Sequence, residues 1–143
     1  MTCARREPDL PGAQPPLELQ AEPRHPLLGV ATALEAGPVV SLPCDMPFVP
    51  GSLLSWLAGQ AEPVVICEGG GRLHPLLGRF AAEVEPGLRA AIEAGTSAQD
   101  TVRGLGGRLA TESEVSNFGP PRRVLFNVND PSDLVEAERM AAE

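Results

Sequence analysis

Short apolar runs alternate with helical patterns along this chain, and that alternation limits the folds open to it. Three short runs have the Val, Leu and Ile content typical of buried strands: 39–42, 63–67 and 124–128. Helical patterns, most with proline near their start or glycine at their end, occupy 26–37, 52–58, 86–95, about 97–103 and 132 onward. The expected helix caps are Ser52, either Thr96 or Ser97, and Asp130. Strands that alternate with helices favour an α/β fold with a mainly parallel sheet.

The length of 143 residues suits one domain with a buried core. Hydrophobic residues make up 43% of the chain and charged residues 21%, which is typical of a folded globular protein. Residues 1–22 are rich in Pro, Glu and Arg and show no sustained periodicity, so we expect an irregular lead-in there. Residues 23–143 are then the folded domain.

The net charge of −8 argues against nucleic acid or an anionic membrane as the main partner. A nucleotide remains compatible, because metal and backbone N–H groups can bind its phosphates. All eleven basic residues are arginine, so the chain has no lysine to grip a phosphate. No apolar stretch follows the N-terminal arginines, and the longest charge-free run, 46–61, is too short to span a bilayer. Cys3, Cys44 and Cys67 are odd in number and include no C-x-x-C pair, so they indicate neither a disulfide framework nor a zinc site, and we expect a cytoplasmic protein.

A carboxylate stands just past the first predicted strand. Asp45 follows the apolar run 39–42, and ligands of open α/β sheets bind at the carboxyl ends of strands. A lone carboxylate there suits Mg²⁺ that carries nucleotide phosphates, since Mg²⁺ prefers one or two carboxylates plus phosphate and water oxygens. An equally good interpretation is that Asp45 only caps a turn between Pro43 and Pro47.

Four short segments follow one another along the chain in the same order as the motifs of a known family: Pro26–Gly29, Leu42–Phe48, Arg72–Leu76 and Phe126–Leu134. They resemble the G-P-L-x-G, C-D-M-P-F, R-x-H-P-L and N-x-N-x-P-x-D-L motifs of the molybdenum cofactor guanylyltransferases, the MobA-type members of the nucleotidyltransferase superfamily. The resemblance runs from about residue 23 to residue 140. It implies a three-layer α/β/α, Rossmann-like nucleotidyltransferase fold.

The resemblance also implies a reaction and a set of site residues. Such enzymes transfer GMP from GTP to the phosphate of molybdopterin, releasing pyrophosphate and giving the guanine dinucleotide cofactor. Asp45 would be the catalytic residue that holds Mg²⁺. Asn127 and Asn129 would line the pterin side, while His74 and Arg72 would lie near the same cleft, with Arg72 on a phosphate. Protein partners of molybdenum cofactor assembly are also implied.

Each of these roles has a simpler alternative. His74 could be a loop histidine with a satisfied hydrogen bond, and the asparagine pair could satisfy backbone groups at a strand end. Arg72, beside three glycines, could be a solvated surface residue. Cys44 and Cys67, in or beside apolar strands, are expected to be small buried hydrophobes.

The resemblance fails at the N-terminus. The family begins with a strand and a glycine-rich loop, L-x-G-G-x-S-x-R-M-G-x-D-K, that no part of residues 1–22 matches, and His25 stands where the family has glycine. We therefore expect a sheet without its first strand and a chain that is poorly active or inactive alone. Three interpretations stay open: the distal part of an enzyme, a shortened paralogue that binds molybdopterin or a partner protein without transferring GMP, or an enzyme that borrows a loop from a second subunit. A generic α/β domain with only structural similarity is a fourth.

Overall fold

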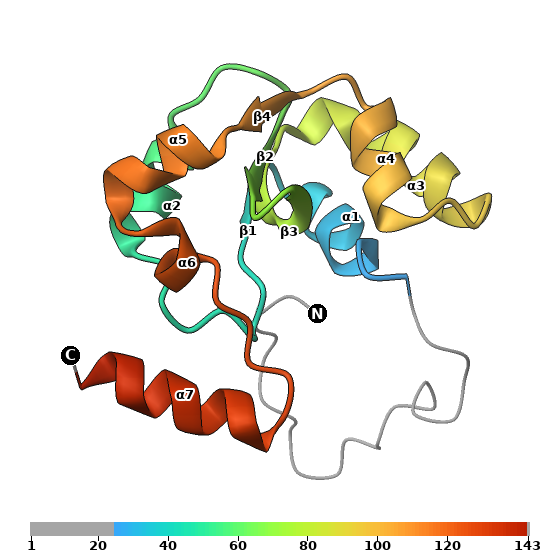
Figure 1. Ribbon diagram of the computed structural model, residues 1–143. Helices are drawn as coiled ribbons and strands as arrows, with labels where there is room; N and C mark the ends of the chain where they lie inside the picture. Colours follow the sequence, from blue (N-terminus) through green and yellow to red (C-terminus); the bar gives the residue numbers. More distant parts are fainter. Residues whose placement is uncertain (1–24, 143) are drawn as a thin grey trace, which may run out of the picture.

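The computed structural model describes residues 25–142, in which four strands form one sheet between helices (Figure 1). The strands are β1 (Val39–Ser41), β2 (Val64–Gly69), β3 (Arg72–Phe80) and β4 (Arg108–Ala110). The helices are α1 (Leu28–Leu34), α2 (Gly51–Ala58), α3 (Glu85–Glu93), α4 (Ala98–Gly104), α5 (Glu112–Val115), α6 (Pro121–Val124) and α7 (Pro131–Ala141). Two short 3₁₀ turns, η2 (Ala82–Val84) and η3 (Ser116–Phe118), complete the described elements. The predicted lead-in at residues 1–22 lies outside the described residues.

Helices cover both faces of the sheet (Figure 1). α1, α3 and α4 lie on one face, where Leu27, Phe80 and Leu88 are buried. α2, α5 and α6 lie on the other face, over a second core that includes Leu53 and Leu77. Successive residues of β2 enter the two cores alternately, as the two-residue period of a strand requires. The predicted three-layer α/β/α arrangement is confirmed.

The sheet is mixed, with the strand order β1-β3-β2-β4. β3 pairs antiparallel with both β1 and β2, whereas β2 pairs in parallel with β4. β1, β2 and β4 therefore share one direction, and β3 runs against them. The α/β class is confirmed, but among the described strands antiparallel pairing is more common than we predicted. The cause is a tight turn between β2 and β3, because only antiparallel strands can be joined so closely.

That turn is formed by Gly70 and Gly71, whose φ angles are +64° and +78°. A type I′ hairpin turn requires positive φ at both central residues, and its twist matches that of the two strands it joins. Farther along, the register of β3 against β2 shifts, so that Ile66 pairs with Gly78 and Cys67 pairs with His74. The shift follows from Pro75, which lies between the two pairs and has no N–H to donate to the ladder. Because proline is uncommon inside strands, β3 was not predicted from the sequence.

The predicted strand at 124–128 is wrong. Val124 ends α6, and the chain then continues to Asp130 as an irregular loop. Val124 and Leu125 are nevertheless buried, because they pack on the second core and against the end of β2. An apolar run alone cannot distinguish a strand from a loop buried by packing.

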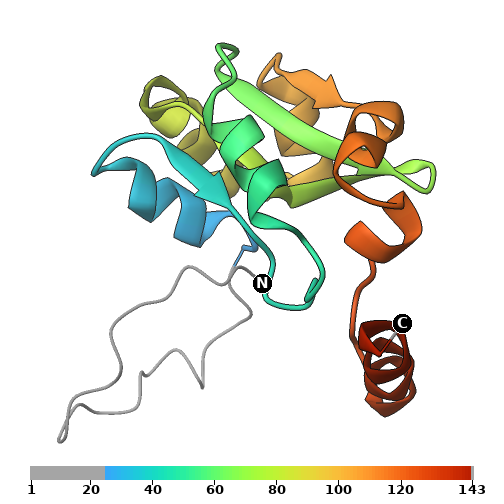
Figure 2. The same cartoon turned by 90° about the vertical axis from the view of Figure 1, so that its left-hand side faces the viewer.

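The helix ends follow the sequence signals with one exception. The Ser97 hydroxyl accepts a hydrogen bond from the Asp100 N–H, and the Asp130 carboxylate accepts one from the Asp133 N–H, so both predicted caps are confirmed. Ser52 lies inside α2 rather than at its cap, which is Pro50. α7 extends away from the layered body (Figures 1 and 2). No helix in the described part of the chain combines the length and the apolar character needed to cross a bilayer.

Candidate functional site

The five side chains predicted for the site line one cavity of about 250 Å³: Asp45, Arg72, His74, Asn127 and Asn129. They come from three separate parts of the chain. Asp45 lies in the turn after β1, Arg72 and His74 lie in the first part of β3, and the asparagines lie in the loop before α7. The fold therefore brings together residues that are more than fifty positions apart in the sequence.

Direct contacts hold the loop before α7 against the Asp45 turn. The Val128 N–H donates to the Asp45 carbonyl oxygen at 2.8 Å. The rings of Phe48 and Phe126 lie 6.5 Å apart, and the Arg123 guanidinium lies 4.3 Å from the centre of the Phe48 ring. Because backbone and aromatic contacts act together, the position of the asparagines relative to Asp45 is fixed by the fold.

The donor set of the cavity fits Mg²⁺. Asp45 is half-buried, and no described residue donates a hydrogen bond to its carboxylate. The side-chain oxygens of Asn127 and Asn129 are further hard donors on the same cavity. No group of three or more His, Cys, Asp or Glu side chains among residues 25–142 is placed to hold a metal by itself. The site therefore suits an ion that takes most of its ligands from a substrate and water.

His74 is buried, with 9% of its surface exposed, and it lies on β3 rather than in a loop. Its Nε2 lies 3.3 Å from the Gly69 carbonyl oxygen. Burial lowers the pKa of His74 below its ordinary 6.5, and nearby Arg72 lowers it further, against the opposing effects of Gly69 and Asp45. A carbonyl can only accept, so the neutral ring donates from Nε2 and keeps Nδ1 as an acceptor. The hydrogen bond expected by the simpler alternative is present, and the ring also lines the cavity.

The two asparagines are engaged differently. The Asn127 side-chain amide donates to the Leu125 carbonyl oxygen at 3.4 Å. The Asn129 backbone N–H donates to Asp133 Oδ2 at 3.0 Å, which ties the loop to the first turn of α7. No described residue hydrogen-bonds the Asn129 side chain, which is exposed at the cavity.

A second cavity of about 330 Å³ adjoins the first and shares Arg72, His74 and Asn127 with it. It adds Glu112 and Arg122, which the sequence analysis missed. Glu112 Oε1 accepts a hydrogen bond of 2.7 Å from the Gly70 N–H and so fixes the tip of the β2–β3 hairpin. The signal that could have drawn attention to Glu112 is the capping box T-E-S-E, which marks the start of α5.

The two described cysteines have different environments. Cys67 on β2 is fully buried, as expected, and burial raises the pKa of its thiol to about 12, with a smaller contribution from Glu114. Cys44 is exposed, so the expectation that it is buried is wrong. The reason is that β1 ends at Ser41, which leaves Cys44 in the turn beyond the strand.

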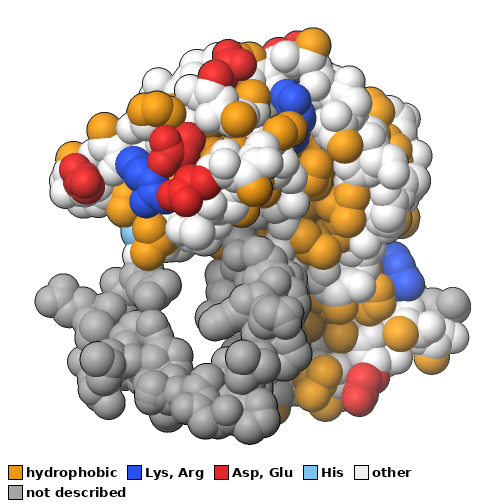
Figure 3. All heavy atoms as spheres, turned by 180° about the vertical axis from the view of Figure 1, so that it is seen from behind, with side chains coloured by type: hydrophobic (Ala, Val, Ile, Leu, Met, Phe, Trp, Pro, Cys, Tyr) orange, Lys and Arg blue, Asp and Glu red, His pale blue; other side chains and the backbone are white. Residues whose placement is uncertain are grey.

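Charged side chains on the face seen from behind occur singly or in small mixed groups (Figure 3). Among the described residues, Arg89 forms ion pairs with Glu35 and Glu85. No continuous basic surface is seen among the described residues on that face (Figure 3).

Comparison with known proteins places the chain in a family. The profile of the MobA-like NTP transferase domain matches residues 3–111. The chain is 35% identical over 133 residues to a molybdenum cofactor guanylyltransferase of Cereibacter sphaeroides, a match that covers 87% of this chain and 65% of that protein. It is 30% identical over 129 residues to another of Rhodopseudomonas palustris, covering 81% and 60%. The chain thus spans slightly less than two thirds of the length of these relatives.

A solved structure supports the same conclusion. Molybdopterin-guanine dinucleotide biosynthesis protein A from Archaeoglobus fulgidus matches with a TM-score of 0.68 and 26% identity, over 82% of this chain and 63% of that chain. The fold, the motif order and the profile match agree. The chain belongs to the MobA-like NTP transferase domain family.

Proposed function

We propose that this chain serves molybdenum cofactor biosynthesis by forming the site at which GMP passes from GTP to molybdopterin. The observation that carries the proposal is the meeting of Asp45, Arg72, His74, Asn127 and Asn129 at one cavity. Two relatives that are 35% and 30% identical to this chain are named molybdenum cofactor guanylyltransferases. A cavity with one unengaged carboxylate, two amides and an arginine suits a phosphate-bearing ligand with its metal.

In the proposed reaction, a terminal phosphate oxygen of molybdopterin attacks the α-phosphorus of GTP. One P–O bond forms, and the bond from the α-phosphorus to the bridging oxygen breaks, so that pyrophosphate leaves with the electron pair. Such a step needs charge neutralisation and in-line positioning more than a protein nucleophile. Mg²⁺ held by Asp45 would supply charge neutralisation at the phosphates.

The protein's own residues orient the acceptor. Arg72 is exposed beside the cavity, and no described residue forms an ion pair with it, so it is free to bind a phosphate. Neutral His74 presents Nδ1 as a hydrogen-bond acceptor. The side-chain amide of Asn129 can both donate to and accept from the molybdopterin side.

A second candidate is a binding protein that holds molybdopterin, or a partner in cofactor assembly, without transferring GMP. The observation that favours it is the small positive charge of the site: among the described residues, Arg72 is the one cation that lines the Asp45 cavity. Stabilising a departing pyrophosphate ordinarily requires several cations or preorganised N–H donors. We place either function in the cytoplasm, where GTP is available.

Pyrophosphate release from GTP and molybdopterin, with and without Mg²⁺, tests the proposal. The guanylyltransferase proposal expects release that is slow, because no residues match the family's glycine-rich loop motif, but that depends on Mg²⁺. This release should be lost in Asp45→Asn and retained in Asp100→Asn, an exposed carboxylate outside the cavity. Molybdopterin binding without release from the wild type would support the second candidate. If molybdopterin does not bind, or if Asp45→Asn behaves like the wild type, the proposed site is wrong.

A further inference from the structure

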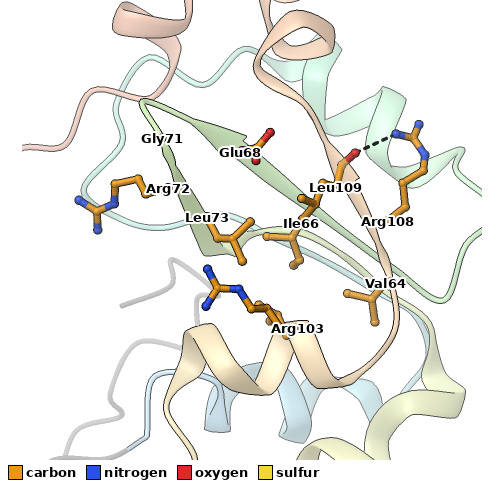
Figure 4. Close-up of a pocket in the computed structure, with 11 residues that line it drawn as sticks. Val64, Ile66, Glu68, Gly71, Arg72, Leu73, Arg103, Arg108 and Leu109 are labelled. Carbon is orange, nitrogen blue, oxygen red and sulfur yellow. Dashed lines mark hydrogen bonds between the residues drawn. The ribbon is translucent and has the colours of Figure 1, made fainter.

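A third cavity, of about 270 Å³, lies between α4 and the strands β2 and β4 (Figure 4). Its apolar lining consists of Val64, Ile66, Leu73, Val102 and Leu109. Most of these side chains are buried in the first core, but Leu109 on β4 is 41% exposed. A mainly apolar cavity of this size can take one small ring system.

Two charged side chains make this cavity selective. Glu68 is on the same face of β2 as Val64 and Ile66, because residues two apart on a strand share a face. No described residue hydrogen-bonds or pairs with its carboxylate. Arg103 extends from α4 toward Leu73 on β3 (Figure 4) and has only a loose ion pair, 3.7 Å long, with Asp100. A carboxylate and a guanidinium therefore stand over an apolar lining.

The other arginine on the β4 side is already engaged. Arg108 donates to Glu114 Oε1 at 2.9 Å and to Gln60 Oε1 at 3.1 Å, and it points away from the rest of the lining in Figure 4. Arg108 therefore lines the edge of the cavity with its guanidinium already hydrogen-bonded. Beside Arg72, Glu68 and Arg103 are the charged side chains that a ligand would meet there.

Arg72 connects this cavity to the site described above. Arg72 and Leu73 line both the third cavity and the Asp45 cavity. A ligand with a ring in one compartment and a phosphate in the other would therefore pass Arg72 at the junction. Molybdopterin has these two parts, a planar ring and a phosphate-bearing arm.

We propose that the third cavity binds the pterin ring of molybdopterin, with Glu68 accepting from the ring N–H and the 2-amino group and Arg103 packing against the ring. The inference rests on the proposed function. The adjacent ring N–H and amino group of a 2-amino-4-oxo heterocycle are two parallel donors, which match the two oxygens of a carboxylate. Arginine packs well on aromatic faces. Asn127 and Asn129 then face the phosphate-bearing arm instead of the ring.

Guanine has the same 2-amino-4-oxo edge, so the test must separate the two rings. The probe is 6-hydroxymethylpterin, whose own fluorescence reports binding to the full chain without GTP or metal. We expect saturable binding, weakened about tenfold or more in Glu68→Gln, since a charged hydrogen-bond acceptor is lost. Glu93→Gln, which removes an exposed carboxylate on α3, should bind like the wild type. Lumazine has an oxo group in place of the 2-amino group. It should bind to the wild type as weakly as 6-hydroxymethylpterin binds to Glu68→Gln.

Three results would overturn the assignment: no pterin binding, equal affinity in Glu68→Gln, or equal affinity for lumazine. If guanosine binds more tightly than 6-hydroxymethylpterin and its binding depends on Glu68, the cavity is a guanine site and the pterin assignment is wrong. Asp45→Asn separates this inference from the proposed function, because Asp45 does not line the third cavity. We expect Asp45→Asn to bind 6-hydroxymethylpterin normally and to lose the Mg²⁺-dependent steps, GTP binding and pyrophosphate release.

Discussion

At the scale of single residues, the chemistry of the site depends on which polar groups the fold satisfies and which it leaves open. The Glu112 carboxylate accepts a hydrogen bond from the Gly70 N–H, and the Asp130 carboxylate caps α7. The carboxylate of Asp45 has no such structural partner among the described residues. The sequence indicated Asp45 by its place after a strand, but it could not distinguish a turn cap from an open ligand, because that depends on neighbours distant in sequence.

His74 gives a prediction about pH. Burial makes its pKa lower in the folded chain than the ordinary 6.5 of the unfolded chain. As the pH falls through that value, the unfolded state takes up the proton first, so the free energy of unfolding decreases until the folded pKa is reached. His74→Gln cannot titrate and should lose this part of the pH dependence.

Urea unfolding of the wild type and of His74→Gln from about pH 7.5 to about pH 5.5 measures the effect. The difference between the two proteins cancels the contribution of all other groups. We expect the wild type to lose more stability than the variant over this interval. Parallel curves would show that His74 has the same pKa in both states.

At the scale of elements, the helices and their caps were largely predictable, whereas the hairpin was not. Ser97 and Asp130 are local signals, and each acts within the next turn of its own helix. β3 instead contains Pro75 and Gly78, two residues that ordinarily argue against a strand, and it is completed by pairing with β1 and β2. The loop at 125–129 was wrongly predicted as part of a strand for a related reason. Its apolar side chains are buried by tertiary packing and not by pairing in the sheet.

Gly78 should be essential to this sheet. A Cβ at position 78 would lie 2.2 Å from the Val65 carbonyl oxygen and 3.1 Å from Ile66 Cα, so the backbone of β2 would have to move. We expect Gly78→Ala to lower the free energy of unfolding by more than about 2 kcal/mol, as disruptive core changes do. Urea denaturation of Gly78→Ala and of the wild type measures this loss of unfolding free energy.

Gly104→Ala is the matched control. It lies at the end of α4, where a Cβ would meet nothing within 4 Å and φ is not positive. The change should be neutral or stabilising by up to about 1 kcal/mol, because alanine favours helix and restricts the unfolded chain. Equal losses in both variants would contradict the role given to Gly78.

At the scale of the whole molecule, the sheet brings three distant segments to one edge. The sequence motifs predicted five side chains that the fold brings to the Asp45 cavity. They did not reveal the adjoining cavities, because Glu68, Arg103 and Arg122 belong to no recognisable pattern and meet the site only through the strand order. The motif resemblance therefore predicted which residues meet at the Asp45 cavity, and the fold shows which cavities adjoin it.

Calorimetric titration of GTP into the chain, with and without Mg²⁺, tests the central claim most directly. That claim is that the Asp45 cavity is a metal-dependent nucleotide site. We expect saturable heat that requires Mg²⁺ and disappears in Asp45→Asn, while circular dichroism shows the variant folded. No heat at millimolar GTP, heat independent of Mg²⁺, or equal affinity in Asp45→Asn would contradict the claim.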